Sequence, residues 1–275
     1  MRNLLDRSVA LGLLLRRLRR LGDRAIRSRS RRGNVAMLHA GRCGSSVLAD
    51  LLDQRSDFHW AGELFENVPP VYLRMDPEHR ARERIANAMW RAPAPYFGFD
   101  SKYLPEQHLH RDLANKSVPG YVELLEQLGF RHFILLGRRN HLRRAVSVAV
   151  GTKTGQWNTA GQVERATVRL DLANFASYGA RMPLLDYFRS LDAVHGDARA
   201  ALRGRQVLEL DYESDIERDP QVAYDKTCAW LGLAPQPVQV RLKKINDRRL
   251  GDIVENFGDV QALLSGTPYE WMLSG

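Results

Sequence analysis

The sequence predicts an α/β domain with a central, mostly parallel sheet flanked by helices. In two parts of the chain a buried strand precedes a helix. The first pair is a strand over residues 34–40 and a helix over 47–53, and the second is a strand over 132–136 and a helix over 142–150. Both strands are short, nearly continuous apolar runs, as in strands that are buried on both faces of a parallel sheet. The chain also has the length for one large α/β domain, since about 240 residues follow a basic first segment.

Positive charge is concentrated in that first segment. Residues 1–32 contain eleven arginines and only two acids, Asp6 and Asp23, and they account for the whole net charge of +9. Residues 33–275 carry 30 basic and 30 acidic side chains. We therefore divide the chain into a basic leader, 1–32, and an electroneutral domain, 33–275. This distribution excludes a globally basic protein that coats nucleic acid.

The leader contains no segment long enough to span a membrane, since its longest apolar run is only Val9–Leu15. Residues 3–21 are typical of a cationic amphipathic helix. Such a leader would adsorb to an anionic membrane surface, extend into solvent, or dock on the domain. With only two cysteines, Cys43 and Cys228, the chain fits a reducing compartment. We expect a cytoplasmic protein, held by its leader at the inner membrane surface if the first alternative holds.

The first strand runs into the turn Gly41-Arg-Cys-Gly-Ser-Ser46, and a helix follows. Glycines allow the backbone to curl so that successive N–H groups converge on an anion, and the helix N-terminus adds partial positive charge. This order is typical of P-loop-like phosphate sites. However, the G-x-x-x-x-G-K-[ST] pattern of nucleoside triphosphatases is missing because the turn has no lysine. The alternative is an ordinary turn with a serine that caps the helix.

A second segment favours an anion site. Residues 127–163 contain no acidic side chain but include six cations: Arg131, Arg138, Arg139, Arg143, Arg144 and Lys153. An electroneutral domain that concentrates cations in this way is expected to bind a polyanion locally. Arg139 at the end of the second strand and Ser147 on the following helix are placed to converge on one phosphate.

These segments resemble the sulfotransferases that use 3′-phosphoadenosine 5′-phosphosulfate (PAPS). The turn is similar to the family's 5′-phosphosulfate loop, and Arg139 with Ser147 eight positions later matches the pair that clamps the 3′-phosphate. Residues 208–216 resemble a family element that brings a tyrosine to the nucleotide. The resemblance covers about residues 33–273. It implies that PAPS is bound by Arg42, Cys43, Gly44, Ser45, Ser46, Arg139, Ser147 and Tyr212.

The resemblance further implies that Arg42 stabilises charge on the leaving group and that Glu63 is the general base for the acceptor hydroxyl. Glu63 could instead cap a helix or pair with an arginine. Asp100 and His59 are the competing bases. Lys102 lies two positions beyond the family's usual lysine, which keeps it on the same side of a strand. The chemistry requires no metal, and the sequence shows no cluster of metal ligands.

We therefore expect transfer of a sulfuryl group from PAPS to a hydroxyl of a carbohydrate or glycolipid. Helical insertions at residues 64–95 and 155–200 would shape the acceptor pocket. Two other functions stay open. One is a P-loop kinase-like ATP phosphotransferase, and the other is a non-catalytic protein that binds membranes or polyanions through its leader.

Overall fold

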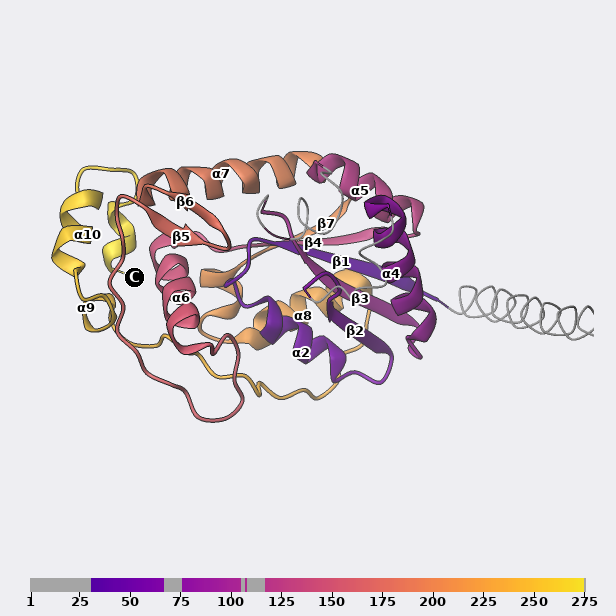
Figure 1. Ribbon diagram of the computed structural model, residues 1–275. Helices are drawn as coiled ribbons and strands as arrows, with labels where there is room; N and C mark the ends of the chain where they lie inside the picture. Colours follow the sequence, from indigo (N-terminus) through magenta and orange to yellow (C-terminus); the bar gives the residue numbers. More distant parts are fainter. Residues whose placement is uncertain (1–30, 67–75, 105–106, 108–116, 275) are drawn as a thin grey trace, which may run out of the picture.

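The computed structural model describes residues 31–66, 76–104, 107 and 117–274. Its centre is a five-stranded sheet in which every neighbouring pair of strands is parallel. Across the sheet the strands are β2 (Phe58–Glu63), β3 (Tyr96–Lys102), β1 (Gly33–His39), β4 (His132–Gly137) and β7 (Gln206–Asp211) (Figure 1). Helices flank this sheet, so the prediction of an α/β domain with a parallel sheet is confirmed.

Both faces of the sheet are buried, as the apolar strand sequences predict. Along β1, Val35 and Met37 belong to one core, while Ala36 and Leu38 belong to the other. The first core is completed by α2 (Ser45–Asp53) and α8 (Pro220–Leu231). The second is completed by α4 (Pro77–Arg91), α5 (Val118–Gln127), α6 (His141–Thr154) and α7 (Leu184–Ala201). The strand periodicity of two therefore fixes which helices share a core.

The two predicted strand–helix pairs are present, with small shifts at their ends. Helix α2 begins on the two serines of the turn, and α6 begins at His141. The side chain of Asn140 caps α6 by accepting a hydrogen bond of 2.8 Å from the backbone N–H of Arg143. The carboxyl ends of β1 and β4 thus lead directly into the helices that border the candidate site.

The segment 155–200, expected to be a helical insertion, is helical only in part. Before α7, this segment forms the hairpin of β5 (Phe175–Ser177) and β6 (Ala180–Met182), joined by Tyr178 and Gly179. Buried Phe175 and Ser177 flank exposed Ala176, which is the alternation of a strand rather than of a helix. In the other insertion, residues 64–95, the described part contains α4 as expected.

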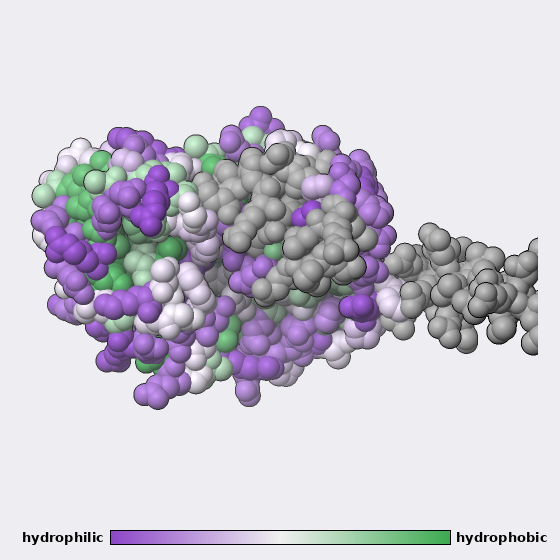
Figure 2. All heavy atoms as spheres, in the orientation of Figure 1, coloured by the Kyte–Doolittle hydropathy of each residue, from purple (hydrophilic) through white to green (hydrophobic). Residues whose placement is uncertain are grey.

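The C-terminal end of the domain consists of short helical elements. They are α9 (Leu250–Ile253), α10 (Phe257–Leu264) and a 3₁₀ helix (Glu270–Ser274). Hydrophobic residues show at the surface at this end of the molecule (Figure 2). A π-helical turn (Tyr212–Ile216) follows β7 and leads toward α8.

Most of the predicted leader lies outside the described residues, and so does the expected amphipathic helix. The last two residues of the leader, Arg31 and Arg32, contact the domain. The Arg31 guanidinium donates to the carbonyl oxygens of Met89 and Ala94, at 2.6 and 2.7 Å, and the Arg32 N–H donates to that of Pro95. Within the described ranges, no helix combines the length and apolar character needed to cross a membrane.

The contact between Gly98 and Trp60 ties β3 to β2. A Cβ atom on Gly98 would overlap the Trp60 ring, whose Nε1 donates to the Asp100 carboxylate at 2.9 Å. We therefore expect Gly98→Ala to lower the free energy of unfolding by about 1–3 kcal/mol, because the ring must leave its place. Urea denaturation measures this change. The control is Gly196→Ala in α7, where an added Cβ has no neighbour within 4 Å, and we expect equal or greater stability.

Candidate functional site

The turn between β1 and α2 curls as a phosphate-binding loop does. Gly41, Arg42 and Gly44 all have positive φ angles, of 82°, 58° and 84°. At Gly44 a Cβ atom would lie 2.8 Å from the Ile216 side chain, so this position requires glycine for both space and backbone conformation. The loop ends at the N-terminus of α2, which has no acidic residue in its first turn. This arrangement suits an anion.

Two arginines from the neighbouring strand–helix unit hold the loop carbonyls. Arg144 is 1% exposed and donates to the carbonyl oxygens of Ala40 and Gly41, the second at 3.0 Å. Arg138 donates to the Arg42 carbonyl at 2.9 Å. Three successive carbonyls are therefore occupied by guanidinium groups. Gly44 and the first residues of α2 are left to line the adjoining cavity.

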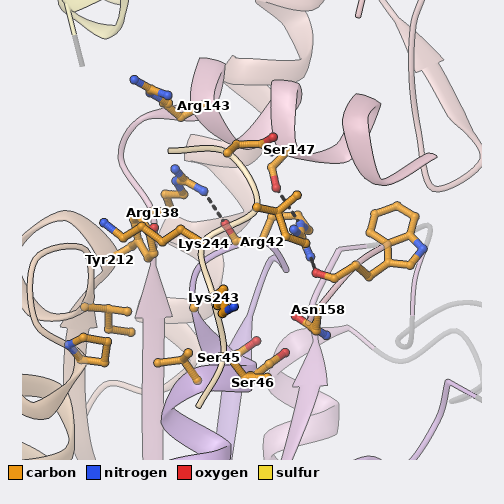
Figure 3. A pocket seen from close by; sticks show the side chains of 18 residues that line it. Arg42, Ser45, Ser46, Arg138, Arg143, Ser147, Asn158, Tyr212, Lys243 and Lys244 are labelled. Atoms are coloured by element: carbon orange, nitrogen blue, oxygen red, sulfur yellow. Dashed lines mark hydrogen bonds between the residues drawn. The ribbon is translucent and has the colours of Figure 1, made fainter. Parts of the chain in front are cut away.

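That cavity is strongly cationic. Among the described residues that line it there are five cationic side chains and no carboxylate. Arg42 crosses the cavity, where its Nε donates to Ser147 Oγ at 2.9 Å and its Nη1 to the Trp157 carbonyl at 2.6 Å. Figure 3 shows how the side chains surround the space. The polar lining is made by Arg42, Ser45, Ser46, Arg138, Arg143, Ser147, Asn158, Lys243, Lys244 and Asn246.

One wall of the cavity is less polar and suits a flat ring. It is formed by Tyr212, Ile216, Pro220 and Leu242. The Arg138 guanidinium lies over the Tyr212 ring, 4.2 Å from its centroid. Cations next to apolar groups are what a phosphorylated nucleoside requires.

The structure brings together most of the residues that the sequence predicted. Arg42, Gly44, Ser45, Ser46, Ser147 and Tyr212 all line this cavity. Cys43 does not, because its side chain is 1% exposed and packs in the core shared with α2. A side chain so placed cannot reach the ligand, and Cys43 contributes only its backbone to the loop.

Arg139 does not lie in the cavity, contrary to the expected pairing with Ser147. Its side chain is 64% exposed and forms an ion pair with Asp211 at 3.0 Å, while its N–H donates to Glu213. Arg138 lines the cavity instead. The two arginines follow the last residue of β4, where successive side chains project in opposite directions, so the motif spacing identified a residue one position too far.

Two further cations reach the cavity from a distant segment. Lys243 and Lys244 come from the loop before α9, and the Lys243 N–H donates to the Thr159 carbonyl at 2.8 Å. In the sequence they belong to a basic patch with Arg248 and Arg249, which either closes the nucleotide site, as the resemblance implies, or is a solvated surface patch. The structure brings Lys243 and Lys244 to the cavity.

The ion-pair partner of the candidate base lies beside the first glycine of the loop. Glu63 at the end of β2 forms an ion pair of 2.5 Å with Lys102 at the end of β3. The Lys102 Cε would lie 3.5 Å from a Cβ atom on Gly41. Burial raises the pKa of Glu63, and the Lys102 charge opposes part of this rise. Lys102 thus lies next to the loop, although it is not one of the residues that line the cationic cavity.

The competing bases are occupied elsewhere. Asp100 is 4% exposed and accepts hydrogen bonds from Trp60 Nε1 and His39 Nε2. His39 holds its proton on Nε2, because its Nδ1 accepts the Gly41 N–H at 3.0 Å. His59 lies near the amino end of β2, where its Nδ1 is 3.6 Å from Asp53 Oδ1. Asp100 therefore braces the loop through His39.

His39, Glu63 and Asp100 also have the spacing of a metal site. Their ligand atoms lie within 4.8 Å of one another. Donors from Trp60 and Lys102 already occupy the two carboxylates, and the neighbouring ammonium charge opposes a second cation. The network is better described as a hydrogen-bonded support for the loop and the candidate base.

Comparisons with known proteins place the chain among distant neighbours only. No family model matches it, and no curated protein matches it. A solved structure of a sulfotransferase from Alicyclobacillus acidocaldarius is similar over 88% of this chain and 94% of that chain, with 17% identity and a TM-score of 0.49. A likeness of this degree carries no argument about activity.

The positions of Arg138 and Arg139 give a matched test of the site. We expect Arg138→Ala to weaken binding of adenosine 3′,5′-bisphosphate by tenfold or more, because a charged donor inside the cavity is lost. Arg139→Ala should change the affinity by less than about threefold, since screened surface charges contribute little. Calorimetric titration measures both. The reverse order of effects would show that a phosphate lies on the Asp211 side of β4.

Proposed function

We propose that the protein is a PAPS-dependent sulfotransferase that acts on a hydroxyl of a carbohydrate or glycolipid. The observation that carries the proposal is the curled, lysine-free loop in which Arg42 reaches Ser147 across a cavity without carboxylates. Such a cavity suits a ligand with two separated anionic groups. The less polar wall beside Tyr212 suits the adenine of the same ligand.

The donor would bind with its 5′-phosphosulfate at the loop. The N–H groups of Gly44, Ser45 and Ser46 would hold the 5′-phosphate at the start of α2. The 3′-phosphate would be bound by cations on the other side of the cavity, with Arg138 in the place first expected for Arg139. Lys243 and Lys244 add charge where the C-terminal loop covers the site.

In the transfer step, the acceptor oxygen attacks sulfur in line with the bridging oxygen. A bond forms between the acceptor oxygen and sulfur, while the bond from sulfur to the bridging oxygen breaks. The acceptor proton passes to the Glu63 carboxylate, and adenosine 3′,5′-bisphosphate leaves with the bonding electrons. Arg42 stabilises the charge that grows on the bridging oxygen, so the protein acts by position and electrostatics.

The ion pair of Glu63 and Lys102 fits this role for two reasons. It lies at the carboxyl ends of β2 and β3, next to the first glycine of the loop. Its side chains are 17% and 13% exposed, so the carboxylate is largely removed from water. A desolvated carboxylate with a raised pKa accepts a proton more readily than an exposed one.

The basic leader fits the same proposal. Residues 1–32 would hold a cytoplasmic enzyme at the inner, anionic membrane surface, where a lipid-linked sugar is accessible. Attachment of this kind leaves the nucleotide site unchanged, because every cation that lines the cavity lies beyond residue 41.

Ligand-dependent thermal stability separates the three candidate functions. We expect adenosine 3′,5′-bisphosphate to raise the melting temperature, because ligand at a hundred times Kd stabilises the native state by about 2.7 kcal/mol. Adenosine 5′-monophosphate, which lacks only the 3′-phosphate, is the matched control and should stabilise less. Stabilisation by ATP alone would favour the phosphotransferase, and stabilisation by heparin alone would favour a polyanion-binding protein.

The role of Glu63 predicts both a variant and a pH profile. Glu63→Gln should keep nucleotide affinity and lose about 10²- to 10⁴-fold in turnover, since the amide cannot accept the proton. In the wild type, turnover should fall as the pH drops through the raised pKa of Glu63, because the protonated carboxyl is no base. Transfer of labelled sulfate from PAPS to a panel of cell-envelope sugars measures both. Undiminished turnover of the variant would exclude Glu63 as the base.

A further inference from the structure

Tyr178 has an unusual backbone conformation at the tip of the β5–β6 hairpin. Ser177 pairs with Ala180, so Tyr178 and Gly179 alone form the turn, and their φ angles are 49° and 97°. Two-residue turns with positive φ at both positions normally carry Asn-Gly or Gly-Gly. A bulky side chain in the left-handed region is strained, and such strain persists where the surrounding structure enforces it.

The strained turn is anchored firmly to the domain. Buried Phe175 packs against Tyr187 of α7, with ring centroids 4.9 Å apart. The Ser177 and Tyr187 hydroxyls are hydrogen-bonded at 3.1 Å. The hairpin therefore projects Tyr178 in a fixed direction, out of the insertion and toward the phosphate loop.

Three groups of the candidate site meet the Tyr178 side chain. Its hydroxyl would lie 3.5 Å from a Cβ atom on Gly41, the first glycine of the loop. The Lys102 ammonium lies 5.7 Å from the centroid of its ring, and the Trp157 ring stacks on it at 6.1 Å. Lys102 in turn holds Glu63, and Trp157 holds Arg42 through its carbonyl. Tyr178 thus connects the candidate base to the cation that faces the leaving group.

We propose that Tyr178 is a catalytic residue whose hydroxyl donates a hydrogen bond to a non-bridging oxygen of the transferred sulfuryl group. The inference rests on the proposed sulfotransferase function. The hydroxyl lies at the glycine end of the loop, close to Gly41, and the ring that carries it contacts Lys102, the ion-pair partner of Glu63. A donor there contacts the sulfuryl group and leaves the two phosphates untouched. Tyr178 itself transfers no proton. The face of its ring holds Lys102 by a cation–π contact.

The position of the hydroxyl leads to a test that needs no acceptor. Tyr178→Phe keeps the ring and loses the donor, so the affinity for PAPS should fall about tenfold or more while that for adenosine 3′,5′-bisphosphate stays the same. The matched control is Tyr96→Phe, which removes a hydroxyl at the amino end of β3. Calorimetric titration of both ligands measures the ratio of affinities. An unchanged ratio in Tyr178→Phe would overturn the inference.

Failure of the proposed function gives a different result from failure of this inference. If the wild type binds neither ligand, the protein does not use PAPS, and the role of Tyr178 falls with that function. If the wild type binds both and Tyr178→Phe retains the full ratio, only the role of Tyr178 is excluded.

A second variant separates catalysis from a structural role. Asparagine tolerates positive φ, so Tyr178→Asn should fold with a melting temperature no lower than that of the wild type. It should show the same loss of PAPS affinity as Tyr178→Phe. A lower melting temperature with an unchanged ratio of affinities would show that Tyr178 serves the stability of the hairpin.

Discussion

The site depends on the guanidinium groups that hold the carbonyls of Ala40, Gly41 and Arg42. Arg138 and Arg144 provide these contacts, and Arg144 is almost completely buried. A loop whose carbonyls faced the cavity would repel an anion. Because the carbonyls are bonded to arginines, the positive end of α2 and the side chain of Arg42 face the cavity. The electrostatic character of the site thus follows from backbone orientation as much as from its charged side chains.

The same loop is also supported by a chain of hydrogen bonds through the buried side chain of His39. His39 accepts the Gly41 N–H and donates to Asp100, which also accepts from Trp60. This buried chain links β1, β2 and β3 at their carboxyl ends, where Glu63 and Lys102 lie. The His39–Asp100 hydrogen bond and the Glu63–Lys102 ion pair therefore lie together beside Gly41. A shift of β3 would therefore move groups on both sides of the loop.

Sequence patterns identified local features well and side-chain directions poorly. The curled backbone of the loop 41–46 was expected from the sequence because glycines and the start of a helix are local features. Arg139 was placed wrongly because one position at the end of a strand reverses the direction of a side chain. Asp211 and Glu213, which attract Arg139, lie more than 70 residues away, at the end of β7 and in the π-helical turn after it. Tyr178 was missed altogether, since its importance lies in a backbone angle and in three contacts with distant segments.

The sequence by itself determined the α/β class, the curled turn before the first helix and the separation of a basic leader from an electroneutral domain. Those features follow from apolar periodicity, glycine placement and charge, which are properties of neighbouring residues. The tertiary structure decided which cations reach the cavity, that Glu63 pairs with Lys102, and that Asp100 is hydrogen-bonded to His39 and Trp60. Each of these depends on which strand ends meet, and strand order is set by packing across the whole sheet. Local sequence does not determine the order of the strands.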